Sequence, residues 1–201
     1  MGFDATNYTD TFNGTSAATP VVSGAVALIL EANPDLDWRE VQDILVRTAR
    51  QTDPTHPGWS LNGADLYVNH DYGFGAIDVG AAVDLALDYA GLPEEQSIGT
   101  GVVDVDLAIP DADGSVVSHT VNIDSLIEVQ HIEVGFNATH ENRGNLRVVL
   151  TSPNNTQSVL AESRSADAGV DYDWTFTTTR HWGELTPGAV SYTHLTLPTK
   201  A

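Results

Sequence analysis

Residues 12–34 read FNGTSAATPVVSGAVALILEANP. The run VVSGAVALIL within this stretch is apolar on nearly every side, which predicts a helix buried in the middle of a domain. Proline is tolerated in the first turn of a helix, so Pro20 places the start of this helix close to Ser16. Asn33 and Pro34 end it. The stretch therefore predicts a buried helix that opens on a serine.

A serine at the start of a helix has two interpretations. Its hydroxyl becomes a nucleophile when a base takes its proton and donors stabilise the oxyanion. A first-turn N–H lacks an intrahelical partner, the helix dipole favours negative charge there, and Gly14 allows a close approach of backbone or substrate. The alternative is an N-cap, which is the favoured interpretation for the tripeptide Gly14-Thr15-Ser16 taken alone.

Two further helices are predicted before residue 91. Asp37-Trp38-Arg39-Glu40 has the pattern of a capping box and opens a helix through about Ala49. Asp78 is expected to cap a third helix that ends near Gly91. The inward-facing residues of the second helix are expected to be Val41, Ile44, Leu45 and Thr48.

The pattern changes to period two after the short polar stretch 91–96. Apolar residues then alternate with polar ones, and turn clusters rich in Pro, Asp, Asn and Gly separate the alternating segments. Several short strands at this spacing predict a β-sandwich or jelly roll. The expected strands lie around residues 102–107, 117–123, 132–138 and 146–150.

The composition excludes several classes of partner. Acidic residues number 28 and basic residues 8, which gives a formal net charge of -20. Such a chain repels nucleic acid and anionic membrane surfaces, so neither is expected as a partner. The apolar runs are too short and too interrupted to predict a membrane span. The absence of cysteine excludes disulfides and thiolate metal sites.

The acidic residues have an uneven composition. Aspartate outnumbers glutamate by 19 to 9, and Lys200 is the only lysine. An acidic surface that uses arginine in place of lysine resembles proteins of salt-loving organisms, where high ionic strength screens the repulsion between carboxylates. We therefore expect a halophilic protein. The alternative is an ordinary acidic secreted protein, for example one that binds calcium.

The whole string FNGTSAATPVVSGAVALILEANP resembles the nucleophile segment of the subtilisin-like serine proteases, the subtilases, in which G-T-S-x-A-x-P opens the central helix. Residues 33–42 and 70–78 are similar to the kexin-like and proprotein-convertase-like branch of that family. The β-rich half resembles the P domain, also called the homo B domain, of the same branch. The matching residues there are 132–134, 143–146, 150–153, 173–176 and 181–184.

The resemblance implies an α/β fold, represented by the C-terminal helices of a subtilase catalytic domain, followed by an all-β jelly-roll P domain. The implied divisions are residues 1–90 for the catalytic part, 91–97 for a linker and 98–189 for an incomplete P domain. The chain is then a fragment of a longer serine endopeptidase. Its partners would be protein or peptide substrates, with the P domain packed on the catalytic domain.

Carried over residue by residue, the resemblance makes Ser16 the nucleophile and its N–H one oxyanion donor, with Gly14 and Thr15 shaping the loop. The catalytic aspartate, histidine and oxyanion asparagine of the family precede the serine, and only fifteen residues do so here. The fragment itself is therefore expected to be inactive. The alternative function is a P-domain module that stabilises or binds without catalysis.

Further expectations follow from the family. Relatives commonly bind structural calcium, but no site can be assigned here, and Asp104, Asp106 and the cluster 111–114 are expected to form solvated turns. The location would be secreted or at the cell surface, although Met1-Gly2-Phe3-Asp4 does not resemble a signal peptide. Structural or solvent-facing roles, in place of catalysis, are expected for His56, His70, His119, His131, His140 and His181.

The last twelve residues, VSYTHLTLPTKA at positions 190–201, differ from what the family implies. The codons gtc tct tat aca cat ctg acg ctg ccg acg encode the first ten and resemble the end of a transposon-type sequencing adapter. We expect residues 190–201, including His194, to be an adapter translation. The alternative is a genuine β-strand, because residues 192–197 alternate in polarity.

Overall fold

The computed structural model of the protein describes residues 11–110 and 116–196. The chain divides into two compact units, and each is considered by itself. The helical unit comprises Met1–Thr55 and Phe74–Glu94, and the β unit comprises His56–Gly73 and Glu95–Ala201. These units are defined by packing, so the domain boundaries expected from the sequence at residues 90 and 97 stay predictions.

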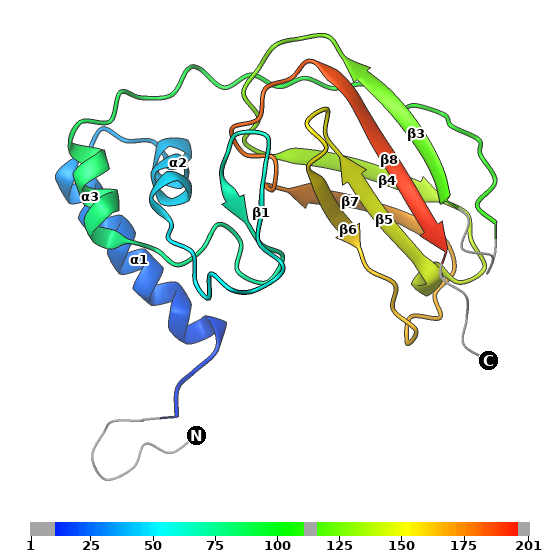
Figure 1. Ribbon diagram of the computed structural model, residues 1–201. Coiled ribbons are helices and arrows are strands. Elements are labelled where there is room, and N and C mark those ends of the chain that lie inside the picture. The colour runs from blue at the N-terminus through cyan, green and yellow to red at the C-terminus, as the bar shows by residue number, and fades with distance from the viewer. Residues whose placement is uncertain (1–10, 111–115, 197–201) are drawn as a thin grey trace. The chain divides into compact units, whose positions relative to one another are not determined.

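Among the described residues, three helices form the helical unit (Figure 1). They are α1 (Thr15–Ala32), α2 (Trp38–Thr48) and α3 (Val79–Leu87). Their small core contains one residue of α1 and two each of α2 and α3, all buried: Ile29, Val41, Ile44, Ala82 and Ala86. Leu45 and other partly buried residues pack around this core. The sequence pattern thus predicted the inward positions Val41, Ile44 and Leu45 of α2, but not the burial of Asp43 on the same helix.

The sequence predicted the ends of α1 correctly, but not its environment. Pro20 is the sixth residue of the helix and not part of its first turn, so the Ser16 carbonyl lacks the usual i+4 donor. The expectation of a buried helix is wrong for the described structure, in which only Ala25 and Ile29 of α1 are buried. Val21 is 64% exposed, because the unit supplies neighbours to one side of the helix only.

Helix α1 is also long and apolar enough to cross a membrane, when length and composition alone are considered. This criterion is weak, since core helices of soluble proteins and signal sequences also meet it. The expectation that the chain lacks a membrane span is therefore not confirmed.

The predicted caps of α2 and α3 are confirmed. Asp37 and Glu40 form a capping box, with 2.9 Å from the Glu40 N–H to Asp37 Oδ1 and 2.9 Å from the Asp37 N–H to Glu40 Oε2. The Asp78 side chain accepts a hydrogen bond of 3.0 Å from the Ala81 N–H at the start of α3. Helix α3 ends at Leu87, earlier than predicted.

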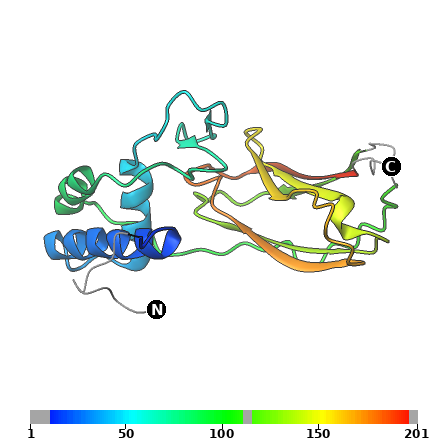
Figure 2. The ribbon, with the colours of Figure 1, turned by 90° about the horizontal axis from the view of Figure 1, so that it is seen from below.

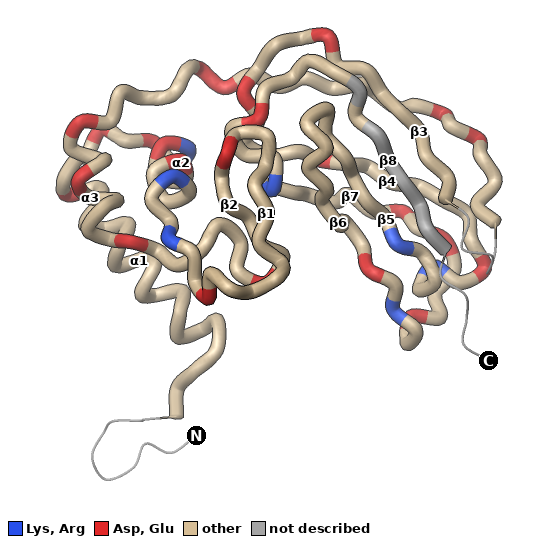
Figure 3. The backbone as a smooth tube through the Cα atoms, in the orientation of Figure 1, with Lys and Arg blue, Asp and Glu red and all other residues tan. Residues whose placement is uncertain are grey.

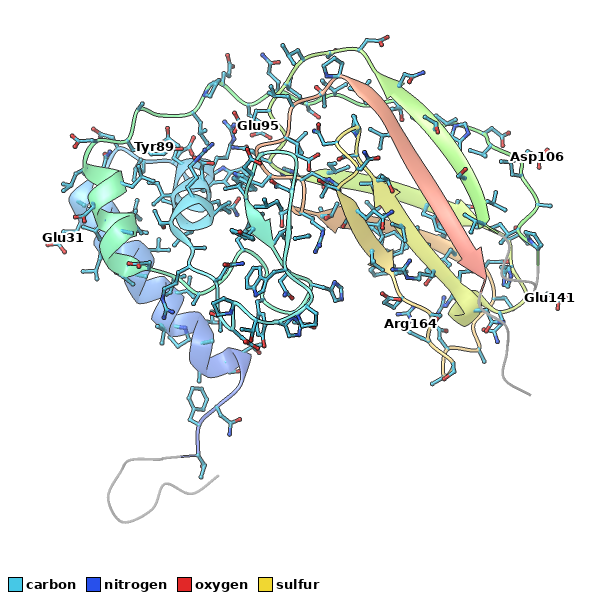
Figure 4. All side chains as sticks on the ribbon, viewed as in Figure 1. Glu31, Tyr89, Glu95, Asp106, Glu141 and Arg164 are labelled. Carbon is cyan, nitrogen blue, oxygen red and sulfur yellow. The ribbon has the colours of Figure 1, made fainter. Side chains whose placement is uncertain are left out.

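A buried carboxylate on α2 joins this helix to the chain after α3. Asp43 is only 1% exposed and accepts hydrogen bonds of 2.6 Å from Arg47 Nε and 2.6 Å from the Tyr89 hydroxyl. Figure 4 labels the Tyr89 side chain. Burial and the hydrogen bond to Asp43 raise the pKa of Tyr89, so its hydroxyl stays protonated and remains a donor.

Removing this donor tests the importance of the link. Tyr89→Phe should lower the free energy of unfolding by about 1.5–3 kcal/mol, because a hydrogen bond to a buried charged group is lost. Urea unfolding followed by the helical circular dichroism signal measures this. Tyr67→Phe, at an exposed tyrosine of the β unit, is the control and should change stability by less than about 0.5 kcal/mol. Equal effects of the two substitutions would contradict the assignment.

In the part of the β unit that the structure describes, the strands form three antiparallel sheets. A four-stranded sheet has the order β3-β8-β5-β6, and the pairs β4-β7 and β1-β2 form two-stranded sheets. Figure 2 shows the strands of the first two sheets at separate levels. The strands are β1 (Ser60–Leu61), β2 (Tyr67–Val68), β3 (Val116–Ile123), β4 (Ile132–Ala138), β5 (Leu146–Thr151), β6 (Gln157–Ala161), β7 (Tyr172–Thr178) and β8 (Gly188–Thr196).

Three of the four predicted strands are present as β3, β4 and β5. The expected strand at 102–107 is wrong, because residues 95–110 form no strand and Val102 is fully exposed. Alternation alone does not make a strand when no neighbouring strand accepts its backbone hydrogen bonds. The buried residues of the unit include Val134, Leu146, Val148, Leu150, Tyr172 and Trp182.

Strand β8 includes part of the segment expected to be an adapter translation. It pairs with β3, where Val190 lies opposite Val121, and with β5, where Thr193 lies opposite Val149. The alternative interpretation, a β-strand, therefore describes residues 190–196, while residues 197–201 lie outside the described residues. The DNA origin of the segment stays a prediction, as does the jelly roll.

Candidate functional site

Ser16 is the second residue of α1 and is exposed. The N-cap of this helix is Gly14, so the interpretation of Ser16 as the capping residue is wrong. Within residues 11–110 and 116–196, the Ser16 hydroxyl has no hydrogen-bond partner. An exposed serine hydroxyl thus lies in the first turn of a helix, where backbone N–H groups have no intrahelical acceptor.

The backbone of Gly14 turns the chain into the helix. Its φ of 78° and ψ of -166° lie in a region that is essentially restricted to glycine. The Gly14 carbonyl accepts hydrogen bonds from the N–H groups of Ala17 (3.1 Å) and Ala18 (3.2 Å). The Thr15 carbonyl accepts one of 2.8 Å from the Thr19 hydroxyl. These bonds hold the first turn while leaving the Ser16 side chain accessible.

Alanine substitutions at Gly14, the N-cap of α1, and at Gly24, inside the helix, should change the stability of the helix in opposite directions. Gly14→Ala places a side chain in a glycine-only conformation at a cost of about 1–3 kcal/mol. In the Gly14→Ala variant, hydrogen exchange of the Ala17 and Ala18 N–H groups, measured by NMR, should become at least about fivefold faster. Gly24→Ala, inside the helix with nothing within 4 Å of the added Cβ, should instead stabilise it by about 0.5–1 kcal/mol. Equal exchange at Ala17 in both variants would refute the role of Gly14.

A nucleophilic serine needs a base, and the helical unit contains no histidine in its sequence. All seven histidines lie at residue 56 or beyond, in the β unit. The buried carboxylate of the helical unit, Asp43, already accepts hydrogen bonds from Arg47 and Tyr89. The described helical unit therefore holds the serine without a histidine base.

His56 forms a histidine–aspartate pair with Asp71. Its Nε2 lies 3.7 Å from Asp71 Oδ2. Its Nδ1 lies 3.0 Å from Asn69 Nδ2 and accepts a hydrogen bond of 3.2 Å from the Gly58 N–H. This arrangement assigns the proton to Nε2 and the acceptor role to Nδ1. Both ring nitrogens are therefore engaged locally, and the pair stabilises the loop that contains it.

The other described histidines have structural or surface environments. His140 is buried and its Nδ1 accepts a hydrogen bond of 3.1 Å from the Asn142 N–H. His181 is buried, with its Nδ1 3.7 Å from Glu184 Oε2. His70 and His131 are exposed. Of the side chain of His194, in β8, the structure describes nothing.

Metal binding receives no support from the described part of the chain, where no group of three or more His, Asp or Glu side chains could hold an ion. Asp104 and Asp106 lie in an exposed stretch without regular structure, and the cluster 111–114 lies outside the described residues. Acidic residues are spread over both units and basic ones are few (Figure 3). Acidic residues therefore occur along both units, and two of them, Asp43 and Glu184, are buried.

Two family models match this chain. The subtilase family matches residues 2–75, and the proprotein convertase P-domain matches residues 129–190. The chain belongs to the subtilases that carry a P domain. Within this subtilase, Ser16 and α1 lie in the first match, and β4 to β7 lie in the second.

Individual relatives agree with this assignment. This subtilase is 36% identical over 188 residues to the PC3-like endoprotease variant B of Hydra vulgaris, covering 90% of this chain and 26% of that protein. It is 35% identical over 185 residues to proprotein convertase subtilisin/kexin type 4 of Mus musculus, covering 88% and 28%. The chain therefore spans about a quarter of the length of these relatives.

The fold also matches a solved structure. The serine protease of Aeromonas sobria aligns with a TM-score of 0.82 and 27% sequence identity, covering 94% of this chain and 38% of that one. The same protease in complex with its chaperone gives a TM-score of 0.81. Helices and strands of this subtilase thus have counterparts in a known serine protease.

Sequence reasoning missed the burial of three polar residues, Asp43, Asn62 and Glu184. It expected a structural or solvent-facing role for His181, which is buried. The Asn62-Gly63 dipeptide is a turn signal that could have located one of them. No local pattern marks Asp43 or Glu184 as buried, because carboxylates are usually exposed.

Proposed function

We propose that this subtilase is part of a serine endopeptidase, in which Ser16 is the nucleophile. The observation that carries the proposal is the exposed Ser16 hydroxyl in the first turn of α1, after the glycine-only conformation of Gly14. Its own N–H would be one oxyanion donor, because the helix start leaves that group without an intrahelical acceptor. Gly14 and Thr15 would shape the loop that presents the serine.

In the parent enzyme, Ser16 Oγ would attack the scissile carbonyl of a protein or peptide substrate. A base would take the hydroxyl proton and deliver it to the departing amine, which leaves an acyl-enzyme on Ser16. Water would then hydrolyse the ester and regenerate the serine. The helical unit contributes the nucleophile, the N-terminal N–H and the positive end of the α1 dipole to this scheme.

The 201-residue chain alone would not hydrolyse peptide bonds. The helical unit has no histidine, and the ring nitrogens of His56 are engaged with Asn69, Gly58 and Asp71. A serine without its base typically loses several orders of magnitude in rate. The base, the aspartate and the oxyanion asparagine would come from the rest of the parent protein.

A fluorophosphonate probe, which reacts with activated serines, tests the proposal. The folded parent should be labelled stoichiometrically at Ser16, and Ser16→Ala should abolish labelling. Ser23→Ala is the matched control on the same helix, where the Ser23 hydroxyl donates to the Thr19 carbonyl, and it should leave labelling unchanged. The 201-residue chain should remain unlabelled. Labelling of the Ser16→Ala parent would overturn the assignment.

The second candidate is a P-domain module that stabilises or binds without catalysis. The β unit supports it, because this unit has its own buried core and contains every strand among the described residues. A mature, folded parent that the probe does not label at all would favour this candidate over the endopeptidase.

Several finer features belong to the same proposal. The sheets of the β unit would complete a jelly roll, and α1 would be a core helix of the protease and not a membrane span, since one side of it packs on α3. Calcium would bind at sites not assigned here. The protein would be secreted or at the cell surface, and it would be halophilic. It would cleave proteins and would not bind nucleic acid.

Salt should stabilise the chain if it is halophilic. With 28 acidic and 8 basic residues, screening of carboxylate repulsion should raise the free energy of unfolding from low to multimolar KCl. Urea titrations at several KCl concentrations measure this. Sucrose at matched water activity is the control, because sucrose is excluded from the protein surface but does not screen the repulsion between charges. A stability independent of KCl would refute halophily.

A further inference from the structure

The sequence contains two Asn-Gly dipeptides, Asn13-Gly14 and Asn62-Gly63. The backbone nitrogen after an asparagine can attack the carbonyl carbon of the asparagine side chain, and glycine favours this attack because it has no Cβ to shield the nitrogen. The reaction needs an asparagine side chain that is free to rotate and a backbone N–H that no acceptor holds. The two dipeptides differ in both respects, so the structure predicts different chemical fates for them.

The first dipeptide is open to this reaction. Asn13 is exposed and lies before α1 in a stretch without regular structure. Its Nδ2 donates a hydrogen bond of 3.1 Å to the Thr11 carbonyl, which leaves the side-chain carbonyl carbon accessible. Within residues 11–110 and 116–196, no acceptor binds the Gly14 N–H. A Cβ on Gly14 would have nothing within 4 Å, so the surroundings of the attacking nitrogen are open as well.

The second dipeptide is held in place. Asn62 is only 4% exposed, its Oδ1 accepts a hydrogen bond of 3.0 Å from the Leu66 N–H, and its Nδ2 donates one of 2.8 Å to the Trp182 carbonyl. The Gly63 N–H donates to Glu184 Oε1 over 2.8 Å. The asparagine side chain is therefore fixed at both ends and the glycine nitrogen is occupied. Ring closure at Asn62 would require local opening of the structure.

We propose that Asn13 is a site of spontaneous deamidation in the loop that precedes Ser16, and that Asn62 stays intact in the folded chain. The other asparagines have less reactive neighbours. Asn33 precedes Pro34, which has no N–H, and every remaining asparagine precedes a residue with a Cβ. Asn13 therefore combines the reactive neighbour with an accessible side chain.

The reaction uses only water and hydroxide. Hydroxide takes the proton of the Gly14 N–H, and the nitrogen attacks the side-chain carbonyl carbon of Asn13. A new C–N bond closes a succinimide ring, while the bond to the amide nitrogen breaks and that nitrogen leaves as ammonia after taking a proton from water. Water then adds to one of the two ring carbonyls and opens the ring. The product is aspartate or isoaspartate, in which the main chain runs through the former side chain.

Either product changes the start of α1. The Gly14 carbonyl accepts hydrogen bonds from the N–H groups of Ala17 and Ala18, and isoaspartate at position 13 adds one carbon to the main chain directly before Gly14. Both products also add a carboxylate near the N–H groups that would stabilise an oxyanion, and a second negative charge there opposes its formation. Loss of the nucleophile's function is the expected consequence, which rests on the proposed role of Ser16.

Mass spectrometry of the folded 201-residue chain tests the modification without reference to catalysis. After incubation at mildly alkaline pH, peptide fragmentation that distinguishes aspartate from isoaspartate should find both products at position 13. Asn13 should react at least about tenfold faster than Asn62, because Asn62 reacts only from an opened state. The rate at Asn13 should rise with pH. Equal rates at the two positions, or an unmodified Asn13, would overturn the proposal.

The unfolded chain is the control for sequence context. In guanidinium chloride both dipeptides are exposed, so Asn13 and Asn62 should react at rates within about threefold of each other. The difference between them in the folded chain then comes from the fold. A difference of the same size in the unfolded chain would show that the structure does not cause it, and the inference would be wrong.

Three variants test the route of the reaction. Asn13→Gln should leave position 13 unmodified, because the longer side chain would have to close a larger ring. Gly14→Ala should slow the reaction at Asn13 at least about fivefold, because the added Cβ shields the nitrogen. Loosening of the turn by this substitution would instead speed the reaction. Asn137→Gln, at an exposed asparagine of β4 that precedes Ala138, is the matched control and should leave the rate at Asn13 unchanged.

The parent protein tests the consequence for Ser16. During incubation, fluorophosphonate labelling should fall in parallel with the loss of intact Asn13. The Asn13→Gln parent should keep its own starting level of labelling over the same time. Full labelling of a parent that is completely deamidated at Asn13 would overturn this consequence. A fresh parent that is never labelled would contradict the proposed function instead, and the mass measurement distinguishes the two failures.

Discussion

The buried carboxylate of Glu184 imposes the strongest constraint on the β unit. A charge removed from water must find hydrogen-bond donors, and Glu184 finds one in the Gly63 N–H of a segment more than a hundred residues earlier in the chain. The neighbouring Asn62 donates from its side-chain amide to the carbonyl groups of Trp182 and Arg180, so the Asn62-Gly63 turn contacts the loop after β7 at several points. Residues 56–73 pack in the same compact unit as the strands, and these hydrogen bonds are part of that packing.

The helical unit also contains a buried carboxylate that is stabilised by hydrogen-bond donors. Asp43 is buried on α2 and is satisfied by Arg47 from the next turn and by Tyr89 from beyond α3. The apolar core beside it is small, so a polar link of this kind contributes a considerable part of the contact between α2 and the chain after α3. In both units, a buried acid joins segments that are distant in sequence.

The candidate nucleophile depends on a different constraint, the backbone of Gly14. Its conformation is available to glycine and costly for other residues, and it places Ser16 inside the first turn and not at the cap. The exposed hydroxyl and the N-terminal N–H groups then lie together in the first turn of α1. Catalysis by the parent would add a base to a serine site that the helix start already organises.

Local sequence was sufficient wherever the determining interaction is local. The Asp37–Glu40 capping box and the Asn33-Pro34 stop each depend on neighbours a few residues apart, and both are present in the structure. The alternating segment 132–138 forms a strand because β7 pairs with it. The G-T-S motif and the P-domain segments likewise identified the family. The strand expected at 102–107 failed because alternation does not supply a partner strand.

Tertiary structure alone decided the exposure of α1, the burial of Asp43 and Glu184, and the contact of the Asn62-Gly63 turn with Trp182 and Glu184. Each of these depends on which distant segments come together, and a carboxylate or an Asn-Gly turn looks the same in sequence whether water or protein surrounds it. The sequence by itself determined the elements, the family and the candidate serine. The fold determined which polar groups leave water, because only packing creates the donors that make their burial possible.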